Sequence, residues 1–182
     1  MSSPLPLLAR HRPALPWIAL SIALAVALGA APAAKTAKPV TAAKPAAGAD
    51  TIGRVTKSDA EWRRQLTPEQ YRVLRRKGTE TAFTGATWDE HRAGTYACAA
   101  CGLALYSSAT KFDSGTGWPS FWAPLDGRHV REVSDTSFGF PATEIVCARC
   151  AGHLGHVFDD GPKPTGLRYC MNSAAMTFRP KQ

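Results

Sequence analysis

Two CxxC pairs constrain the fold of this chain more than any other feature of its sequence. Cys98 and Cys101 form the first pair, and Cys147 and Cys150 form the second. A gap of two residues lets both thiolates of one turn reach a single ion at about 2.3 Å, and two such turns complete a tetrahedron. A site with four sulfur ligands is closed, so the sequence predicts one structural zinc ion per chain. The alternative is that these cysteines form disulfide bonds.

The first 34 residues have the order of a secretory signal peptide, with a basic start, an apolar centre and a small-residue end. Arg10 and Arg12 precede the uncharged run, residues 13–34. We therefore expect residues 1–34 to direct export, to the bacterial periplasm, and to be cleaved. One alternative is an uncleaved anchor facing the periplasm, since the run is just long enough to span a bilayer. A second is an organellar transit peptide.

A low-complexity linker separates the leader from the part of the chain with a globular composition. Residues 35–54 are rich in Ala, Lys and Pro, and residues 55–182 form the predicted folded domain. The net charge of +8 divides evenly, since residues 1–50 hold five Lys/Arg and one Asp and the rest hold 17 Lys/Arg and 13 Asp/Glu. Because half of the excess charge lies outside the domain, we expect no nucleic-acid partner.

Two short helices and a series of strands are predicted for the domain. The capping boxes that start at Ser58 and Thr67 open helices over 58–66 and 67–77, the second with Pro68 in its first turn. After Gly78 only short β-like segments follow, separated by turn residues. The candidate strands are 95–98, 103–106, 121–122, 129–133, 143–147, 156–158, 167–171 and 175–178. The predicted class is mainly antiparallel β with short N-terminal helices.

Cys170 is the one cysteine without a CxxC partner, which makes it a candidate nucleophile. Because an unperturbed thiol is only a few per cent ionised at neutral pH, it needs an activating neighbour. His153 and His156 would point to opposite faces of a straight strand, but a kink at Gly155 would let them converge on the sulfur. Taken singly, an inert core thiol and two turn histidines are the commoner interpretations. Taken together, these residues favour a reactive site.

Trp118 lies in the segment F-D-S-G-T-G-W-P-S-F, residues 112–121, where two glycines and a proline fix a turn. A lone tryptophan is usually part of a core, but one presented on such a turn more often forms a binding surface. Its indole would suit the methyl group of a thioether.

Several separate motifs resemble the methionine sulfoxide reductase B family over about residues 57–178. They are G-W-P-S-F, H-L-G-H-V-F, G-P-x-P-T-G-x-R-Y-C-x-N-S and the two CxxC pairs. The resemblance implies two antiparallel sheets around a structural zinc site, and reduction of the R epimer of methionine sulfoxide, mainly in proteins. By position, it makes Cys170 the nucleophile and Trp118 the methyl-binding residue. It also assigns catalytic roles to His153, His156 and Asn172.

One position departs from the family pattern. Many members carry a resolving cysteine where this chain has Thr116. We therefore expect the sulfenic acid formed on Cys170 to be reduced by an external thiol, either a thioredoxin-like protein or a small thiol, with no organic cofactor. Phe178 is also predicted to bind substrate. Two rival functions are a zinc-ribbon nucleic-acid module and a non-catalytic, zinc-stapled binding domain that uses the Trp118 pocket.

Overall fold

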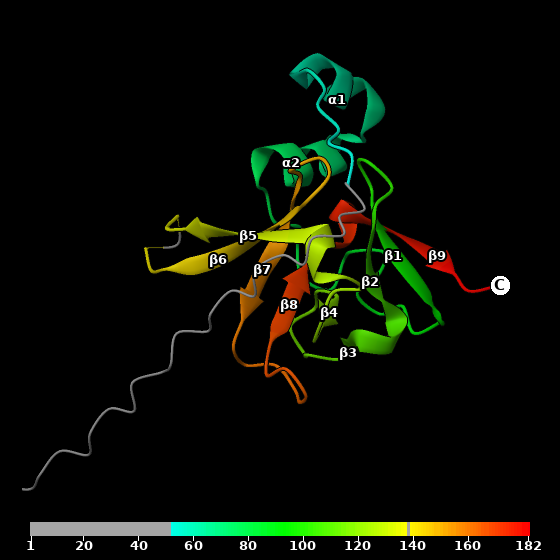
Figure 1. Ribbon diagram of the computed structural model, residues 1–182, viewed down its shortest axis with the longest axis vertical. Helices are drawn as coiled ribbons and strands as arrows, with labels where there is room; N and C mark the ends of the chain where they lie inside the picture. The colour runs from blue at the N-terminus through cyan, green and yellow to red at the C-terminus, as the bar shows by residue number, and fades with distance from the viewer. Residues whose placement is uncertain (1–51, 138) are drawn as a thin grey trace, which may run out of the picture. The chain divides into compact units, whose positions relative to one another are not determined.

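The computed structural model describes residues 52–137 and 139–182 (Figure 1). The predicted leader, and the linker up to residue 51, lie outside the described residues, so their predictions are untested. Among the residues described, no helix has the length and apolar character needed to cross a membrane. The helices and strands lie between Asp59 and Pro180.

The two predicted helices are present as α1 (Asp59–Gln65) and α2 (Pro68–Arg76). Each begins with its capping box: the side chain of Ser58 or Thr67 accepts a hydrogen bond from the third helical N–H, and that residue's side chain accepts one in return. α2 ends at Lys77, whose φ of 54° is left-handed. Its apolar face packs against β7 (His153–Phe158) and thereby reaches the six-stranded sheet.

The strands form the two antiparallel sheets that were expected (Figure 1). The three-stranded sheet has the order β2-β1-β9, from β2 (Ala104–Ser107), β1 (Gly94–Cys98) and β9 (Met176–Pro180). The six-stranded sheet has the order β3-β4-β8-β7-β6-β5. Its other strands are β3 (Lys111–Phe112), β4 (Ser120–Phe121), β8 (Arg168–Met171), β6 (Ala142–Cys147) and β5 (Val130–Asp135).

Every predicted strand segment overlaps an observed strand, and two differences stand out. The two-residue strand β3 was not predicted. β7 begins at His153, three residues earlier than expected, because a bulge lets the chain continue the pairing: Val146 pairs with His153 and Ile145 with Gly155. This bulge lies where the sequence suggested a kink.

A cluster of aromatic rings joins the two sheets beneath the strands that carry the candidate site. Tyr106 of β2 stacks on Phe121 of β4 at 4.5 Å between ring centroids, and Tyr96 of β1 meets the same ring edge-on at 4.9 Å. The Tyr106 hydroxyl donates to the sulfur of Met171, 3.3 Å away. Such ring pairs stabilise by about 0.5–1.5 kcal/mol beyond their buried area. They hold β4 and β8 in a fixed position.

Candidate active site

The four CxxC cysteines come together in one cluster, with all their sulfur atoms within 4.8 Å of one another. The Sγ atoms of Cys98 and Cys150 are 3.6 Å apart, and so are those of Cys101 and Cys147. Zinc–sulfur bonds of about 2.3 Å in a tetrahedron would separate the sulfurs by about 3.8 Å. The cluster therefore has the size and donor chemistry of a four-thiolate metal site.

The two cysteine turns have the same backbone design. In each, the first cysteine ends a strand and its carbonyl accepts the N–H four residues on: Gly102 to Cys98 at 2.8 Å, and Ala151 to Cys147 at 2.9 Å. Gly102 and Ala151 both have a left-handed φ, of 72° and 55°. A left-handed residue lets each turn close with its two thiols facing the other turn.

Cys170 lies on β8 between two neighbouring strands of the six-stranded sheet. It pairs directly with Ser120 of β4 and with His156 of β7. Directly paired residues of antiparallel strands project to the same face, so these three side chains are neighbours. A cavity of about 190 Å³ opens there. Its lining residues are Thr79, Trp118, Gly155, His156, Phe158, Cys170, Met171 and Asn172.

Burial raises the pKa of the half-buried Cys170 thiol, and three neighbours oppose that effect. The largest opposing contribution is the hydrogen bond with Thr116, whose Oγ1 is 3.9 Å from the sulfur. The charge of Arg168 and a hydrogen bond from Ser120 act in the same direction. Arg168 is held by two bonds of 2.8 Å to the carboxylate of Asp160. These three contacts partly offset the cost of burial, and the pKa of Cys170 stays above its ordinary value.

The two histidine rings, on either side of the bulge in β7, are 5.4 Å apart between centroids. The predicted convergence of both rings on the sulfur of Cys170 stays a prediction. A side chain at Gly155 is excluded, because a Cβ there would lie 2.1 Å from the carbonyl oxygen of Cys170. Strands β7 and β8 can approach this closely only with a glycine at that position.

His153 is buried and bound to a carboxylate. Its Nδ1 is 2.8 Å from Oε1 of Glu144, whose Oε2 is 2.7 Å from Nζ of Lys77. Burial lowers the pKa of His153, and the bond to Glu144 only partly opposes this. A neutral ring must donate its Nδ1–H to the carboxylate, which leaves a lone pair on Nε2. Within the described residues, that Nε2 atom has no hydrogen-bond partner.

His156 is oriented by Asp135, the last residue of β5. The Nε2 atom of His156 is 2.9 Å from Oδ2 of Asp135, and this bond holds the pKa of the carboxyl below its usual range. The two histidines thus each have a carboxylate partner from a different strand. Such partners fix the orientation and tautomer of an imidazole.

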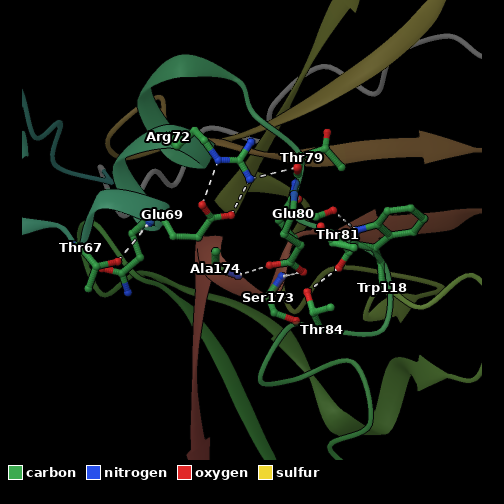
Figure 2. A network of polar contacts seen from close by, with 12 residues as sticks. Thr67, Glu69, Arg72, Thr79, Glu80, Thr81, Thr84, Trp118, Ser173 and Ala174 are labelled. Carbon is green, nitrogen blue, oxygen red and sulfur yellow. Dashed lines mark hydrogen bonds and ion pairs between the residues drawn. The ribbon is translucent and has the colours of Figure 1, made fainter.

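Glu80, in the segment after α2, contacts two residues that line the cavity, Trp118 and Asn172, and Figure 2 shows its contact with Trp118. Its backbone carbonyl accepts the indole N–H of Trp118 at 3.1 Å, and its backbone N–H donates to Oδ1 of Asn172 at 3.0 Å. Its buried carboxylate accepts the N–H groups of Ser173 at 2.5 Å and Ala174 at 2.8 Å. A single segment therefore sets the positions of Trp118 and of the turn after Cys170.

Comparison with known proteins decides the family. Residues 66–180, more than half of the chain, match the SelR domain, and the relatives described below share one name. The chain belongs to the peptide methionine sulfoxide reductase MsrB family.

Three relatives named peptide methionine sulfoxide reductase MsrB illustrate the likeness. The protein of Thiobacillus denitrificans is 62% identical over 125 residues, which are 69% of this chain and 95% of the relative. The Leptospira interrogans protein is 59% identical over 125 residues, with the same two coverages. The Acinetobacter baumannii protein is 54% identical over 131 residues, 72% of this chain and 94% of the relative.

The structure of this MsrB family member brings most of the predicted site residues together. Cys170, His156, Trp118 and Asn172 line one cavity, and the ring of His153 lies against that of His156. Phe178 lies elsewhere: its ring is 5.1 Å from that of Tyr96 and packs under Arg92, and it is not among the residues that line this cavity. Its part in substrate binding stays a prediction.

The sequence did not point to the carboxylates that support the site. Glu80, Asp135 and Glu144 are all distant in sequence from the residue they orient. Only Glu144 carried a usable signal, since it is the one charged residue in strand β6. Phe158, whose ring lies 4.4 Å under the guanidinium of Arg168, is a further cavity residue that was missed.

Proposed function

We propose that this protein reduces the R epimer of methionine sulfoxide, chiefly in oxidised proteins, with Cys170 as its nucleophile. Membership of the MsrB family makes it an oxidoreductase that acts on methionine sulfoxide. The observation that carries the finer proposal is the single cavity that places Cys170 beside His156 and Trp118. A thiol, an acid–base group and an aromatic wall are the parts that this reaction requires.

The chemical step transfers the sulfoxide oxygen to Cys170. The thiolate attacks the sulfoxide sulfur and bonds to it, and the oxygen receives a proton from His156. The resulting hydroxyl group then moves to the Cys170 sulfur, as its bond to the methionine sulfur and the bond between the two sulfurs break. Methionine leaves as a thioether, and the oxygen remains on Cys170 as a sulfenic acid. The sulfoxide is thus reduced by two electrons, and the cysteine sulfur is oxidised by two.

The surrounding residues have supporting parts in this proposal. His153, with a lone pair on the buried Nε2, supports His156, whose ring it contacts. Trp118 would hold the methyl group of the substrate, and its indole is fixed by Glu80. Asn172 orients the chain beside the nucleophile, because its side chain bonds Glu80 and the carbonyl of Leu154. Selection of one epimer then follows from the shape of the cavity.

An external thiol completes the cycle. Thr116, and not a cysteine, faces Cys170, and the other four cysteines form a separate cluster. One thiol condenses with the sulfenic acid to give a mixed disulfide and water, and a second thiol releases Cys170 as its own disulfide forms. We propose a thioredoxin-like protein or a small thiol as this reductant.

We further propose that the four-cysteine cluster binds one zinc ion with a structural role. The sulfur spacing of 3.6 Å fits the tetrahedral geometry of zinc. Four thiolates leave no open coordination position, so the bound ion would hold the two turns together without contacting substrate.

The location of the protein is also a proposal, based on the leader sequence alone. We propose export to the bacterial periplasm, with the uncleaved, membrane-anchored form as the alternative. The N-terminus of protein from the native host would begin between Ala31 and Lys35. An intact Met1 in the cytoplasmic fraction would contradict export, and an intact Met1 in membranes would indicate an anchor.

The separated epimers of a sulfoxide-containing peptide test the function. With dithiothreitol as reductant, the protein is expected to convert the R epimer to methionine and leave the S epimer unchanged. Conversion of the S epimer, or of neither, would contradict the proposal. The matched control is the Cys170→Ser variant under the same conditions, which is expected to convert neither epimer.

A further inference from the structure

Three hydroxyl groups form a continuous row that ends at the sulfur of Cys170. Oγ of Ser120 is 2.8 Å from Oγ of Ser114, which is 2.8 Å from Oγ1 of Thr116. Oγ1 of Thr116 is in turn 3.9 Å from the sulfur, within reach of a hydrogen bond to sulfur. The Ser120 hydroxyl is 3.2 Å from the carbonyl oxygen of Trp118 and also lies within hydrogen-bond reach of the Cys170 sulfur. We call Ser120, Ser114 and Thr116 the hydroxyl row.

The backbone holds the row in place. Gly115 and Gly117, on either side of Thr116, have left-handed φ values of 69° and 83°. The carbonyl of Gly117 accepts the N–H of Phe83 at 2.8 Å, which ties this turn to the segment after α2. Ser120 is fully buried and pairs directly with Cys170 across the sheet. The hydroxyl groups are therefore held next to the sulfur before any substrate binds.

The hydrogen bonds along the row can run in either of two directions, because each hydroxyl can both donate and accept. When Cys170 is a thiol, its S–H donates to Thr116, and the row donates onward to Ser114, to Ser120 and finally to the carbonyl of Trp118. When Cys170 is a thiolate, the hydroxyls rotate, so that Ser114 donates to Thr116, and Thr116 and Ser120 each donate to the sulfur. The proton itself leaves to solvent, and none passes along the row.

We propose that the hydroxyl row stabilises the Cys170 thiolate by reversing its direction, so that Thr116, Ser114 and Ser120 are positioning and activating residues for this nucleophile. The proposal rests on the proposed function only in taking Cys170 to be the nucleophile. It gives Thr116 a task of its own at the position where many relatives carry a resolving cysteine. Hydrogen bonds to a charged acceptor are stronger than those to a neutral one, and neighbouring bonds in a row strengthen each other.

Charged groups on other elements also face Cys170 and must be kept constant in any test. His156 on β7, bound to Asp135, pairs with Cys170. Arg168, two residues away on β8, is bound to Asp160 and also contacts the sulfur. A comparison between variants of the hydroxyl row, with all four of these groups unchanged, isolates the contribution of the row.

The test is the rate at which iodoacetamide alkylates Cys170 as a function of pH, read from the mass of the Cys170 peptide in the folded, metal-loaded protein. Removing the last donor with Thr116→Val is expected to raise the apparent pKa of Cys170 by about 0.5–1 unit, since the bond is long. Ser114→Ala is expected to raise it by less, because Thr116 then loses its own donor. Thr116→Ser, which keeps the hydroxyl, is expected to restore the parent value.

Thr110→Val is the matched control, because the half-buried Thr110 hydroxyl bonds only backbone carbonyls of Ser107 and Ala123 in this structure. It is expected to leave the pKa of Cys170 unchanged. The proposal is overturned if the pKa of Cys170 is unchanged in Thr116→Val. It is also overturned if Thr116→Ser raises this pKa as much as Thr116→Val does. An unchanged pKa in Ser114→Ala would reduce the row to a single bond and overturn it also. Alkylation needs no sulfoxide, so this test of the row is independent of the assay of sulfoxide reduction that tests the proposed function.

Discussion

The four-cysteine cluster and the Cys170 site use the same side chain for opposite purposes. In the cluster, each sulfur faces three other sulfurs, with the closest pairs 3.6 Å apart. At the second site a single sulfur faces the Thr116 hydroxyl at 3.9 Å and a cavity of about 190 Å³. The first arrangement suits a closed metal site, and the second leaves room for a substrate.

The difference shows that the neighbours of a cysteine decide its chemistry. The cluster joins the end of β1 to the end of β6, and so connects the two sheets. Cys170 instead lies within one sheet, between strands that supply hydroxyl and imidazole groups. Stability should therefore depend on the first site and turnover on the second, and variants of each should separate the two properties.

The largest effect is expected for Cys147→Ser, which removes a buried ligand of the cluster. Structural zinc contributes about 10–16 kcal/mol of apparent binding energy in small zinc domains, which is comparable to the whole stability of a typical domain. The variant is expected to lose the metal and its cooperative thermal unfolding. Metal content and a melting curve measure this. If the variant binds no metal and still melts like the parent, folding does not depend on metal at the cluster.

Cys170→Ser is expected to abolish turnover and to leave metal content and melting temperature close to those of the parent. A serine hydroxyl cannot form a sulfenic acid, so no residual chemistry is expected. The same two structural measurements, together with an assay of sulfoxide reduction, decide the matter. Release of the metal by this variant would show that the ligands have been assigned wrongly.

His156 and His153 should differ in how much each contributes to turnover. His156→Ala is expected to lower turnover by about 10²- to 10⁴-fold, the usual contribution of one acid–base group. His153→Ala is expected to cost less, because His153 acts through its neighbour and does not line the cavity. Steady-state rates with the R epimer measure both. Equal activity of both variants and the parent would remove the histidines from the mechanism.

A smaller effect is expected when the carboxylate behind His153 is neutralised. Glu144→Gln leaves His153 and Lys77 with an amide as partner in a buried position. We expect a loss of about 1–3 kcal/mol in the free energy of unfolding, the usual contribution of a hydrogen bond to a charged group. Urea unfolding measures the loss. Glu132→Gln, at an exposed position of the neighbouring strand β5, is the matched control and should have no effect.

The smallest effect concerns pH. Burial holds the pKa of His153 below its ordinary value, so below about pH 6.5 the unfolded chain binds more protons than the folded one. Stability conferred by the neutral ring is therefore complete above that pH and declines as the pH falls toward the folded-state pKa. Urea unfolding at several pH values in this range checks the slope. Stability that increases on acidification would contradict the neutral assignment of His153.

The sequence predicted those features whose signals are local. Capping boxes at Ser58 and Thr67 are complete within four residues, and both helices form as expected. The two CxxC pairs predicted that their four thiols lie together, because a two-residue gap lets both thiols of one turn reach the same ion, and the structure has this cluster. The irregularity in the strand that carries His153 and His156 was also predictable, since Gly155 marked it.

Features that depend on strand register could not be predicted. Asp135 reaches His156 because β5 and β7 both flank β6, and no local pattern states that order. The same holds for Glu80, which meets Asn172 across 92 positions of sequence. Thr116 could be recognised only as the absence of a cysteine. Its place at the end of a row of hydroxyls required the paired positions of β4 and β8.

The most direct test of the account is the mass of the protein after a single exposure to the R epimer without reductant. The account predicts one added oxygen on the Cys170 peptide, trapped by a sulfenic-acid probe, with the metal still bound and no disulfide within the chain. The Cys170→Ser variant should gain nothing. An unchanged mass of the parent protein, or a disulfide between Cys170 and a cysteine of the cluster, would contradict the separation of the two cysteine sites.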